Sequence, residues 1–338
     1  MNYVWNGTDW DALGASVDLS GYMLYTDVDA ITRNELDIIM GIASSVEVLS
    51  TFAMNGGEVS LNSDITTSAP FAVETGTTLT INLNNQTLAS ANNQPIFQVD
   101  GGTLILTGTG KVNAPKTIGY ARNGGQILIE NGKYDSAGNY GFAASGAGSK
   151  VVVDGGTISG QEGGVGAFAG AEVVINDGYL EGKDNFAVFT NGTAGQGGNT
   201  ITMNGGVLVS NIQSAGYEAC GVYIANDDTF IMNDGEILAN NGCGILMRGG
   251  KVTINGGRVI ATGIAGTSGW VGDNKTNMSK SAVIYHQTAK YPAVESMELK
   301  ITGGTFIGVD HSVEVLSDET SPKVSVTGGS FAPAYPEE

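Results

Sequence analysis

One short pattern recurs along this chain and constrains its fold more than any other feature. An alternating apolar segment is followed by Asn, Asp or Thr, then by a pair that ends in glycine, one variable residue and another apolar residue. The pattern occurs eight times, with its second glycines at Gly132, Gly156, Gly178, Gly206, Gly235, Gly257, Gly304 and Gly329. Most steps are 22 to 29 residues, and the single step of 47 predicts one divergent turn hidden between Gly257 and Gly304.

A second apolar segment follows the first at a similar offset, for example at residues 140–144, 186–189 and 244–247. Each turn therefore carries two or three short strands that are separated by glycine-rich corners. This period and composition are typical of a parallel β-helix, in which each turn buries its inward side chains against the next turn. We predict an all-β solenoid of about twelve coils between residues 51 and 331.

The composition excludes several other classes of protein. Glycine accounts for 52 of 338 residues, but no G-X-Y period is present, so the chain is not collagen. Charged residues make up 14% and hydrophobic residues 41%, which is unlike a disordered acidic chain. The net charge of −19 argues against nucleic-acid binding, and no apolar run is long enough to insert into a membrane.

The first 50 residues do not follow the repeat and are expected to form a separate segment, with the solenoid occupying residues 51–338. The segment Trp5–Trp10 is typical of a small hairpin or turn. Thr32 and Glu35 form a capping box that predicts a helix of about twelve residues, with Ile31 and Leu36 as a hydrophobic staple.

An apolar stripe along this helix includes Leu36, Ile39 and Met40. Because so short a helix is only marginally stable alone, the stripe is expected to pack against another surface of the protein or of a partner. The helix either caps the open end of the solenoid or serves attachment or oligomerisation. For the second case the candidate residues are Trp5, Trp10, Ile31, Leu36, Ile39 and Met40. The first residues lack the basic and apolar regions of a secretory signal, which predicts folding in the cytoplasm.

Two sets of residues test the register between coils. We expect the corner residues to form a ladder of side-chain hydrogen bonds along the rod, and its members are Asp154, Asn176, Asn204, Asn233 and Asn255. Cys220 and Cys243 are 23 residues apart, so they should stack in adjacent coils as buried thiols, or alternatively as a disulfide. Asp177 and Asp234 leave a calcium site open as a weaker alternative to the ladder.

Residues 266–281 are too polar and irregular for a coil and are expected to project as a loop. An aromatic ring beside lysine and asparagine makes this loop a candidate contact surface, and its candidate binding residues are Trp270, Lys275, Asn277 and the neighbouring Tyr285. The alternative is an inert surface excursion. His286 and His311 are 25 residues apart, about one coil, and are either two surface histidines or a catalytic pair.

No catalytic residue, metal site or cofactor is predicted. The chain has no nucleophile elbow, P-loop, dinucleotide fingerprint or metal-binding set of histidines and cysteines. Its carboxylates are spread over the corners, and a polysaccharide-cleaving site would need a pair at a defined separation. An enzymatic function would therefore rest on fold analogy alone.

The N-terminal stretches Trp5–Gly14 and Val17–Tyr22 resemble the start of tailed-bacteriophage fibre and decoration proteins, and residues 29–40 resemble a short helical segment of phage head-fibre proteins. Residues 56–331 are similar to the right-handed parallel β-helix repeats of phage tailspikes and of bacterial surface proteins. The resemblance implies a non-enzymatic virion protein, assembled in the host cytoplasm as a homotrimer. Its N-terminus would attach to capsid or tail proteins, and its β-helix would contact glycans or the host surface. The alternatives are a polysaccharide lyase or glycosidase on the same fold, or a bacterial surface adhesin.

Overall fold

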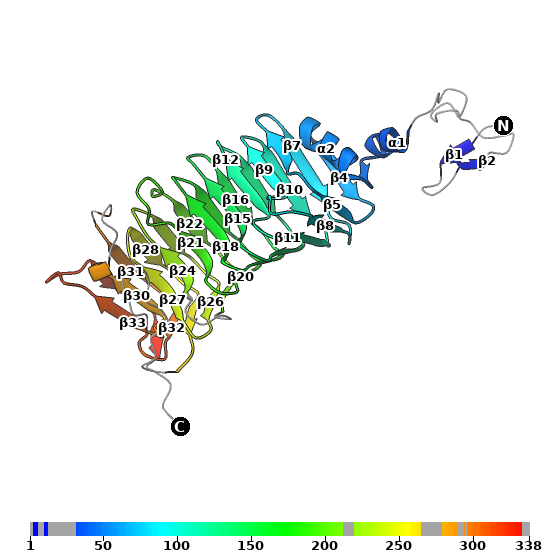
Figure 1. Cartoon of the computed structure of the whole chain (residues 1–338). Coiled ribbons are helices and arrows are strands. Elements are labelled where there is room, and N and C mark those ends of the chain that lie inside the picture. Colours follow the sequence, from blue (N-terminus) through cyan, green and yellow to red (C-terminus); the bar gives the residue numbers. More distant parts are fainter. Residues whose placement is uncertain are drawn as a thin grey trace.

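The computed structural model shows a long rod in which the chain winds as a parallel β-solenoid (Figure 1). The structure describes residues 32–211, 220–264, 279–289, 294 and 296–332, together with the backbone of residues 3–5 and 10–12. Three parallel sheets run the length of the rod, as the repeat predicts. Each coil contributes one strand to each sheet in turn, and glycine-rich corners separate the strands.

The three sheets are numbered here in the order in which each coil visits them. Sheet 1 has twelve described strands, which are β3 (Ile42–Ala43), β4 (Gly57–Leu61), β7 (Thr78–Asn82), β10 (Thr103–Thr107), β13 (Gln126–Ile129), β16 (Lys150–Val153), β19 (Glu172–Ile175), β22 (Thr200–Met203), β25 (Thr229–Met232), β28 (Lys251–Ile254), β31 (Glu298–Ile301) and β34 (Val324–Val326).

Sheet 2 has eleven described strands, which are β5 (Ile65–Thr67), β8 (Thr87–Ser90), β11 (Lys111–Ala114), β14 (Lys133–Ser136), β17 (Thr157–Gly160), β20 (Tyr179–Gly182), β23 (Val207–Ser210), β26 (Glu236–Ala239), β29 (Arg258–Ala261), β32 (Thr305–Ile307) and β35 (Ser330–Ala332). Sheet 3 has ten described strands, which are β6 (Phe71–Glu74), β9 (Phe97–Asp100), β12 (Gly119–Arg122), β15 (Tyr140–Ser145), β18 (Gly163–Phe168), β21 (Phe186–Thr190), β24 (Cys220–Ile224), β27 (Cys243–Met247), β30 (Val283–His286) and β33 (Val313–Leu316).

Side chains alternate between the interior and the surface of the rod. In β16, Val151 and Val153 are fully buried, whereas Lys150 and Val152 point outward and are half-buried. The equivalent inward positions of neighbouring coils stack directly, and together they form one continuous hydrophobic core along the rod.

The described strands form ten complete coils, from β4–β6 to β31–β33, so the expectation of twelve is wrong. The step of 47 residues hides no extra turn. Arg258 pairs directly with Thr305, which places Gly257 and Gly304 in consecutive coils. The additional residues lie within that one coil, between β29 and β31, where the short helix η2 (Gln287–Ala289) follows β30. A corner can accommodate additional residues because the hydrogen bonds between coils fix the length of the strands but not the length of the corners.

The corner glycines explain why the repeat is so regular. All eight second glycines of the repeat have φ between 80° and 110°, a region that residues with a Cβ rarely adopt. At Gly156 a Cβ would also lie 2.8 Å from the carbonyl oxygen of Gly132 in the preceding coil. Conformation and close stacking therefore both require glycine at this point.

Two helices precede the first complete coil. Helix α1 (Arg33–Met40) begins with the expected capping box of Thr32 and Glu35 but has eight residues instead of about twelve, because Gly41 ends it in the left-handed conformation. Helix α2 (Val46–Asn55) was not predicted. It buries Val48 and Leu49 against the first coil, so it closes this end of the core. The first complete coil therefore begins at Gly57, after β3, and residues 51–55 belong to the helix that caps it.

Helix α1 does not bury the predicted apolar stripe. It buries Asp37 instead, which accepts hydrogen bonds from the Nε atom of Arg33 and from the Ser44 hydroxyl. Leu36 is half-buried, while Ile39 and Met40 are 63% and 46% exposed. Farther towards the N-terminus, β1 (Tyr3–Trp5) pairs antiparallel with β2 (Trp10–Ala12), as expected for a hairpin.

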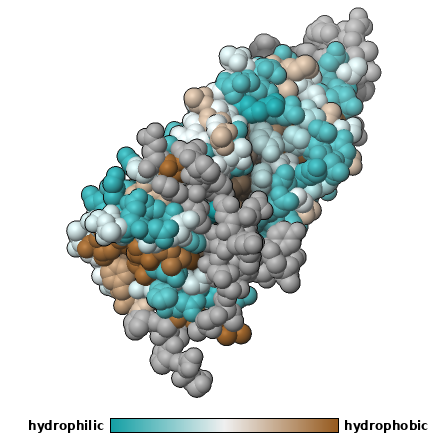
Figure 2. Space-filling model, turned by 60° about the vertical axis from the view of Figure 1, so that its left-hand side comes forward, coloured by the Kyte–Doolittle hydropathy of each residue, from teal (hydrophilic) through white to brown (hydrophobic). Residues whose placement is uncertain are grey.

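The opposite end of the rod has no comparable cap among the residues that the structure describes. Val315, Val326 and Phe331 continue the stacked columns of Tyr285, Ile301 and Phe306, but each is more than a third exposed. Figure 2 shows hydrophobic side chains gathered near this end. The two ends of the core therefore differ: a helix covers one, and the last strands of the other leave core-type side chains exposed.

Replacing the inward-facing Ile254 by alanine should lower the free energy of unfolding by about 2–5 kcal/mol, because a fully buried side chain leaves a cavity. The neighbouring Thr253 points outward and is half-buried, so Thr253→Ala should cost much less. Denaturant unfolding followed by circular dichroism measures both changes. Equal losses for the two variants would contradict the assigned strand orientation.

Candidate functional site

An amide ladder runs along the corner between sheets 1 and 2. The Nδ2 atom of Asn176 donates to Oδ1 of Asp154 over 2.6 Å, and Asn204, Asn233 and Asn255 each donate in the same way to the preceding member over 2.8–2.9 Å. The Thr302 hydroxyl adds a further step by donating to Oδ1 of Asn255. Each amide is used once as donor and once as acceptor, so this corner primarily fixes the stacking of coils.

Cys220 and Cys243 are direct partners in the register of β24 and β27. Both are fully buried, their Sγ atoms are 3.2 Å apart, and no disulfide joins them. Their side chains lie outside the solenoid core, in a second hydrophobic cluster on the outer face of sheet 3.

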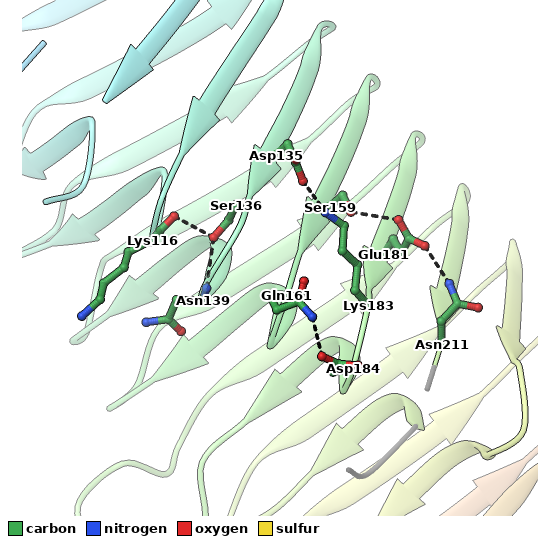
Figure 3. Close-up of polar contacts among 10 residues, drawn as sticks. All are labelled: Lys116, Asp135, Ser136, Asn139, Ser159, Gln161, Glu181, Lys183, Asp184 and Asn211. Atoms are coloured by element: carbon green, nitrogen blue, oxygen red, sulfur yellow. Dashed lines mark hydrogen bonds and ion pairs between the residues drawn. The ribbon is translucent and has the colours of Figure 1, made fainter. Parts of the chain in front are cut away.

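A second polar network lies at the corner between sheets 2 and 3, and it is the best candidate for a functional site (Figure 3). Asp135, Ser159 and Glu181 occupy the same outward position of β14, β17 and β20. The Glu181 carboxylate accepts hydrogen bonds from the Ser159 hydroxyl over 2.8 Å and from the Asn211 amide over 2.6 Å. These contacts from the preceding and the following coil hold the carboxylate in one orientation.

The rest of the network connects three coils. Lys183 reaches back across two coils and forms an ion pair of 2.6 Å with Asp135. The Gln161 amide donates to the Asp184 carboxylate in the next coil, and Asn139 donates its backbone N–H to the Ser136 hydroxyl. Carboxylates, amides, the hydroxyls of Ser136 and Ser159 and the ammonium group of Lys183 thus lie in one network, and hydrogen bonds between coils hold their side chains in place.

Aromatic rings border this network on the side of sheet 3. Tyr140 and Phe186 are half-buried, and each ring packs against the ring of Phe189, with centroid separations of 4.7 and 5.7 Å. Burial raises the pKa of Tyr140 to about 12, with a smaller effect from the nearby Glu162. Its hydroxyl therefore stays protonated and can donate a hydrogen bond throughout the physiological range.

Small residues of sheet 3 make room for these rings. A Cβ on Gly163 or Gly166 would lie only 2.5 or 2.7 Å from the ring of Phe189, so glycine is needed at both positions. The rings of Phe168, Phe189 and Tyr223 are themselves buried, and only the rings at the edge of the cluster are available to a ligand.

The structure does not bring the sequence-predicted binding residues together at this corner. Trp270, Lys275 and Asn277 lie outside the described residues. Tyr285 is described but fully buried, and its ring points into the core, so its assignment to a contact surface is corrected. At the end of the expected loop, Lys280 and Ser281 are buried, so these two residues do not project from the rod, and residues 266–278 lie outside the described residues.

The predicted attachment residues are described in part. Leu36, Ile39 and Met40 lie on α1 at the capped end of the rod. Ile31 falls outside the described residues, and for Trp5 and Trp10 only the backbone is described.

The two histidines are not neighbours in the register. His286 lies opposite Leu316 and is buried, and its pKa is lowered by burial and by the nearby Arg248 guanidinium. His311 is exposed, and its Nδ1 atom lies 3.4 Å from the Ser281 hydroxyl. The expectation that both are surface residues is therefore wrong for His286, and the register does not pair them as catalytic partners.

Sequence reasoning did not find the corner between sheets 2 and 3. Asp135, Ser159 and Glu181 form no recognisable motif, because three different residue types occupy one structural position. Aligning the coils on their second glycines places all three at the same offset: Asp135 follows Gly132, Ser159 follows Gly156 and Glu181 follows Gly178 by three residues each. That alignment was the signal that could have revealed a polar column.

A hollow of about 310 Å³ at another corner is lined by Asp227, Asp228 and Lys251, among others. Asp228 is fully buried, and its Oδ1 accepts two hydrogen bonds from Asn199, whereas Oδ2 has no hydrogen-bond partner within the described segments. Burial raises the pKa of Asp228 to about 6.

No family model matches this chain, and comparisons with curated proteins and with solved structures find no match. Over the residues that can be described, no group of three or more His, Cys, Asp or Glu side chains is arranged to hold a metal ion. None of the helices in the same part of the chain has the length and apolar character that crossing a membrane requires.

Asp228 should make stability depend on pH. Its pKa is higher in the folded state than its ordinary value of 3.8, so its ionisation destabilises the fold as pH rises from about 4 to about 6. Relative to the wild type, Asp228→Asn should gain about 3 kcal/mol between pH 4 and pH 8, since two pKa units correspond to that energy.

Denaturant unfolding of both proteins at pH 4, 6 and 8 measures this difference. The exposed Asp154→Asn variant is the control and should not reproduce the gain above pH 6. A constant difference between Asp228→Asn and the wild type at all three pH values would contradict the buried, ionisable state of Asp228.

Proposed function

We propose that this protein is a structural attachment protein of a virion, fixed by its N-terminal end and binding a glycan through the corner between sheets 2 and 3. The observation that carries the binding role is that the Tyr140 and Phe186 rings come one and two positions after the network residues Asn139 and Asp184 along the chain. The virion role rests on the resemblance of the N-terminal sequence to phage fibre and decoration proteins.

The chemistry of this corner suits a sugar. The apolar face of a sugar ring packs on aromatic rings such as those of Tyr140 and Phe186. Its hydroxyl groups need donors and acceptors with fixed directions, which amides and carboxylates provide. The four carboxylates of Asp135, Glu162, Glu181 and Asp184 outnumber the three ammonium groups of Lys116, Lys133 and Lys183, so a neutral glycan is favoured over an acidic one.

Binding accounts for the network better than cleavage does. A glycosidase needs one carboxyl group that gives a proton to the leaving oxygen and a second that acts on the sugar or on water. Here both Glu181 oxygens already accept hydrogen bonds from protein donors, and Asp135 forms an ion pair with Lys183. These carboxylates are held as acceptors, which suits recognition of hydroxyl groups.

Attachment through the N-terminal end is supported by its exposed apolar side chains. Ile39 and Met40 on α1 lie on the capped end of the rod, as does Met54 on α2, which is 69% exposed. Beside Met40 is a hollow of about 360 Å³, lined also by Glu58 and Ser60. An exposed apolar group next to a hollow is typical of a protein–protein contact.

Glycan binding can be tested on a panel of neutral and acidic surface polysaccharides. We expect the wild type to bind a neutral glycan, and Tyr140→Ala to weaken binding by up to about tenfold, because an aromatic contact contributes about 0.5–1.5 kcal/mol. Phe331→Ala is the matched control, since Phe331 is an exposed aromatic residue of β35 at the far end of the rod.

Unchanged binding by Tyr140→Ala would remove this corner from the binding site. Release of new reducing ends from the bound glycan would overturn the non-enzymatic assignment.

Attachment can be tested by producing variants in cells where the particles assemble. We expect an Ile39→Asp/Met40→Asp double variant to stay folded but to be lost from purified particles, because charge on this surface opposes an apolar contact. Ile264→Asp changes an isoleucine of similar exposure elsewhere on the rod and should be retained. Retention of the double variant on particles would contradict attachment through α1.

A further inference from the structure

The thiols of Cys220 and Cys243 form a pair that the proposed function does not use. The two residues are direct partners in the register of β24 and β27, and their Sγ atoms are 3.2 Å apart. They are also the only two cysteines of the chain. Oxidation can therefore form a single intramolecular disulfide, and its two sulfur atoms already lie side by side.

The backbone at this position is compatible with a disulfide. Neighbouring parallel strands place paired Cα atoms about 4.8 Å apart, which lies within the range of about 4.4–6.8 Å that disulfides require. Because the register is direct, both side chains leave the same face of sheet 3, where they belong to one outer hydrophobic cluster. The sulfur atoms can therefore reach bonding distance by side-chain rotation, without a shift of either strand.

The surroundings restrict which reactions these thiols undergo. Both cysteines are fully buried, so a cysteine of another chain or a bulky reagent does not reach them in the folded rod. A small uncharged oxidant such as hydrogen peroxide needs only a minor local opening. Lys280 is also buried, and burial lowers the pKa of its ammonium group, while the charges of Asp310 and Cys243 act in the opposite direction. A thiolate that forms at Cys243 during oxidation therefore has a cation close to it.

We propose that Cys220 and Cys243 are a redox-sensitive clasp, which a peroxide closes into a disulfide between two consecutive coils. One thiolate attacks the peroxide: an S–O bond forms, the O–O bond breaks, and hydroxide leaves and takes up a proton to become water. The second sulfur then attacks the sulfenic acid: an S–S bond forms, and the S–O bond breaks with release of a second water. Two thiols and one peroxide thus give one disulfide and two waters.

A closed clasp joins one coil of the rod into a covalent ring. The chain between the two cysteines contains β25 and β26, so the disulfide links the start of β24 to the start of β27 in the next coil. Such a link restricts the unfolded chain more than the folded one and stabilises the fold. Cytoplasm keeps thiols reduced, whereas the exterior of a cell is oxidising. On the proposed virion role, on which this timing alone rests, the clasp stays open during assembly and closes after release.

Full-length protein that has been purified in reduced form tests this proposal. After treatment with hydrogen peroxide, the number of thiols that can be labelled in the unfolded protein should fall from two to zero. The tryptic peptide 184–248 contains both cysteines and should lose about 2 Da, the mass of two hydrogens. The midpoint of denaturant unfolding should be higher than in the same oxidised sample after reduction with dithiothreitol.

Cys243→Ser is the matched control, because the rod already accommodates serine at the equivalent position. The register partner of Ile245 is Val283. Ser281 therefore occupies the position of Cys243 in the next coil, and it too is buried. After the same treatment, the peptide of this variant should not lose 2 Da, and its unfolding midpoint should not respond to dithiothreitol.

A methionine on the surface reports whether the oxidant has acted, since Met54 is 69% exposed. Two intact thiols in a sample whose Met54 has become the sulfoxide would overturn the proposal, as would cysteines that gain oxygen atoms in place of forming a disulfide. A disulfide that forms without raising the midpoint would overturn the stabilising role of the clasp. The glycan panel and the particle assay measure other surfaces, so failure of the clasp and failure of the proposed function are told apart.

Discussion

The backbone hydrogen bonds between successive coils determine the rest of this structure. They join parallel strands with direct register in all three sheets, so a residue in one coil lies over its equivalent in the next. One repeated pattern consequently produces straight columns of like positions. Inward columns make the continuous core, and the corner columns make the amide ladder from Asp154 to Thr302.

The corners are free of this restriction, and there the coils differ from one another. The corner after β29 accommodates many more residues than its neighbours without disturbing the pairing of Arg258 with Thr305. The corner between sheets 2 and 3 carries different polar residues in successive coils, such as Ser159, Glu181 and Asn211, which bind one another across coils. A solenoid therefore combines a uniform scaffold with variable corners, and its most distinctive chemistry lies at those corners.

Sequence reasoning predicted the fold, the ladder geometry and the pairing of Cys220 with Cys243, because all three depend only on the length of the repeat. It was wrong about Tyr285, since the buried run Val283–His286 has no alternation from which to tell inward from outward. It missed helix α2, whose residues cap the first coil and do not belong to the repeat. It also missed the corner network, because contacts between coils are made by residues 20 to 30 positions apart that share no motif.

The sequence by itself determined that the chain winds, where glycine must turn it, and which residues stack, because period and backbone conformation are local properties. Only the tertiary structure decided that the described strands form ten complete coils, that α1 leaves Ile39 and Met40 exposed, and that Glu181 lies between Ser159 and Asn211. These outcomes depend on which surfaces compete for burial once the coils are stacked. Because the competing residues are far apart in the chain, no single segment of the sequence predicts which side chains are buried and which contact one another.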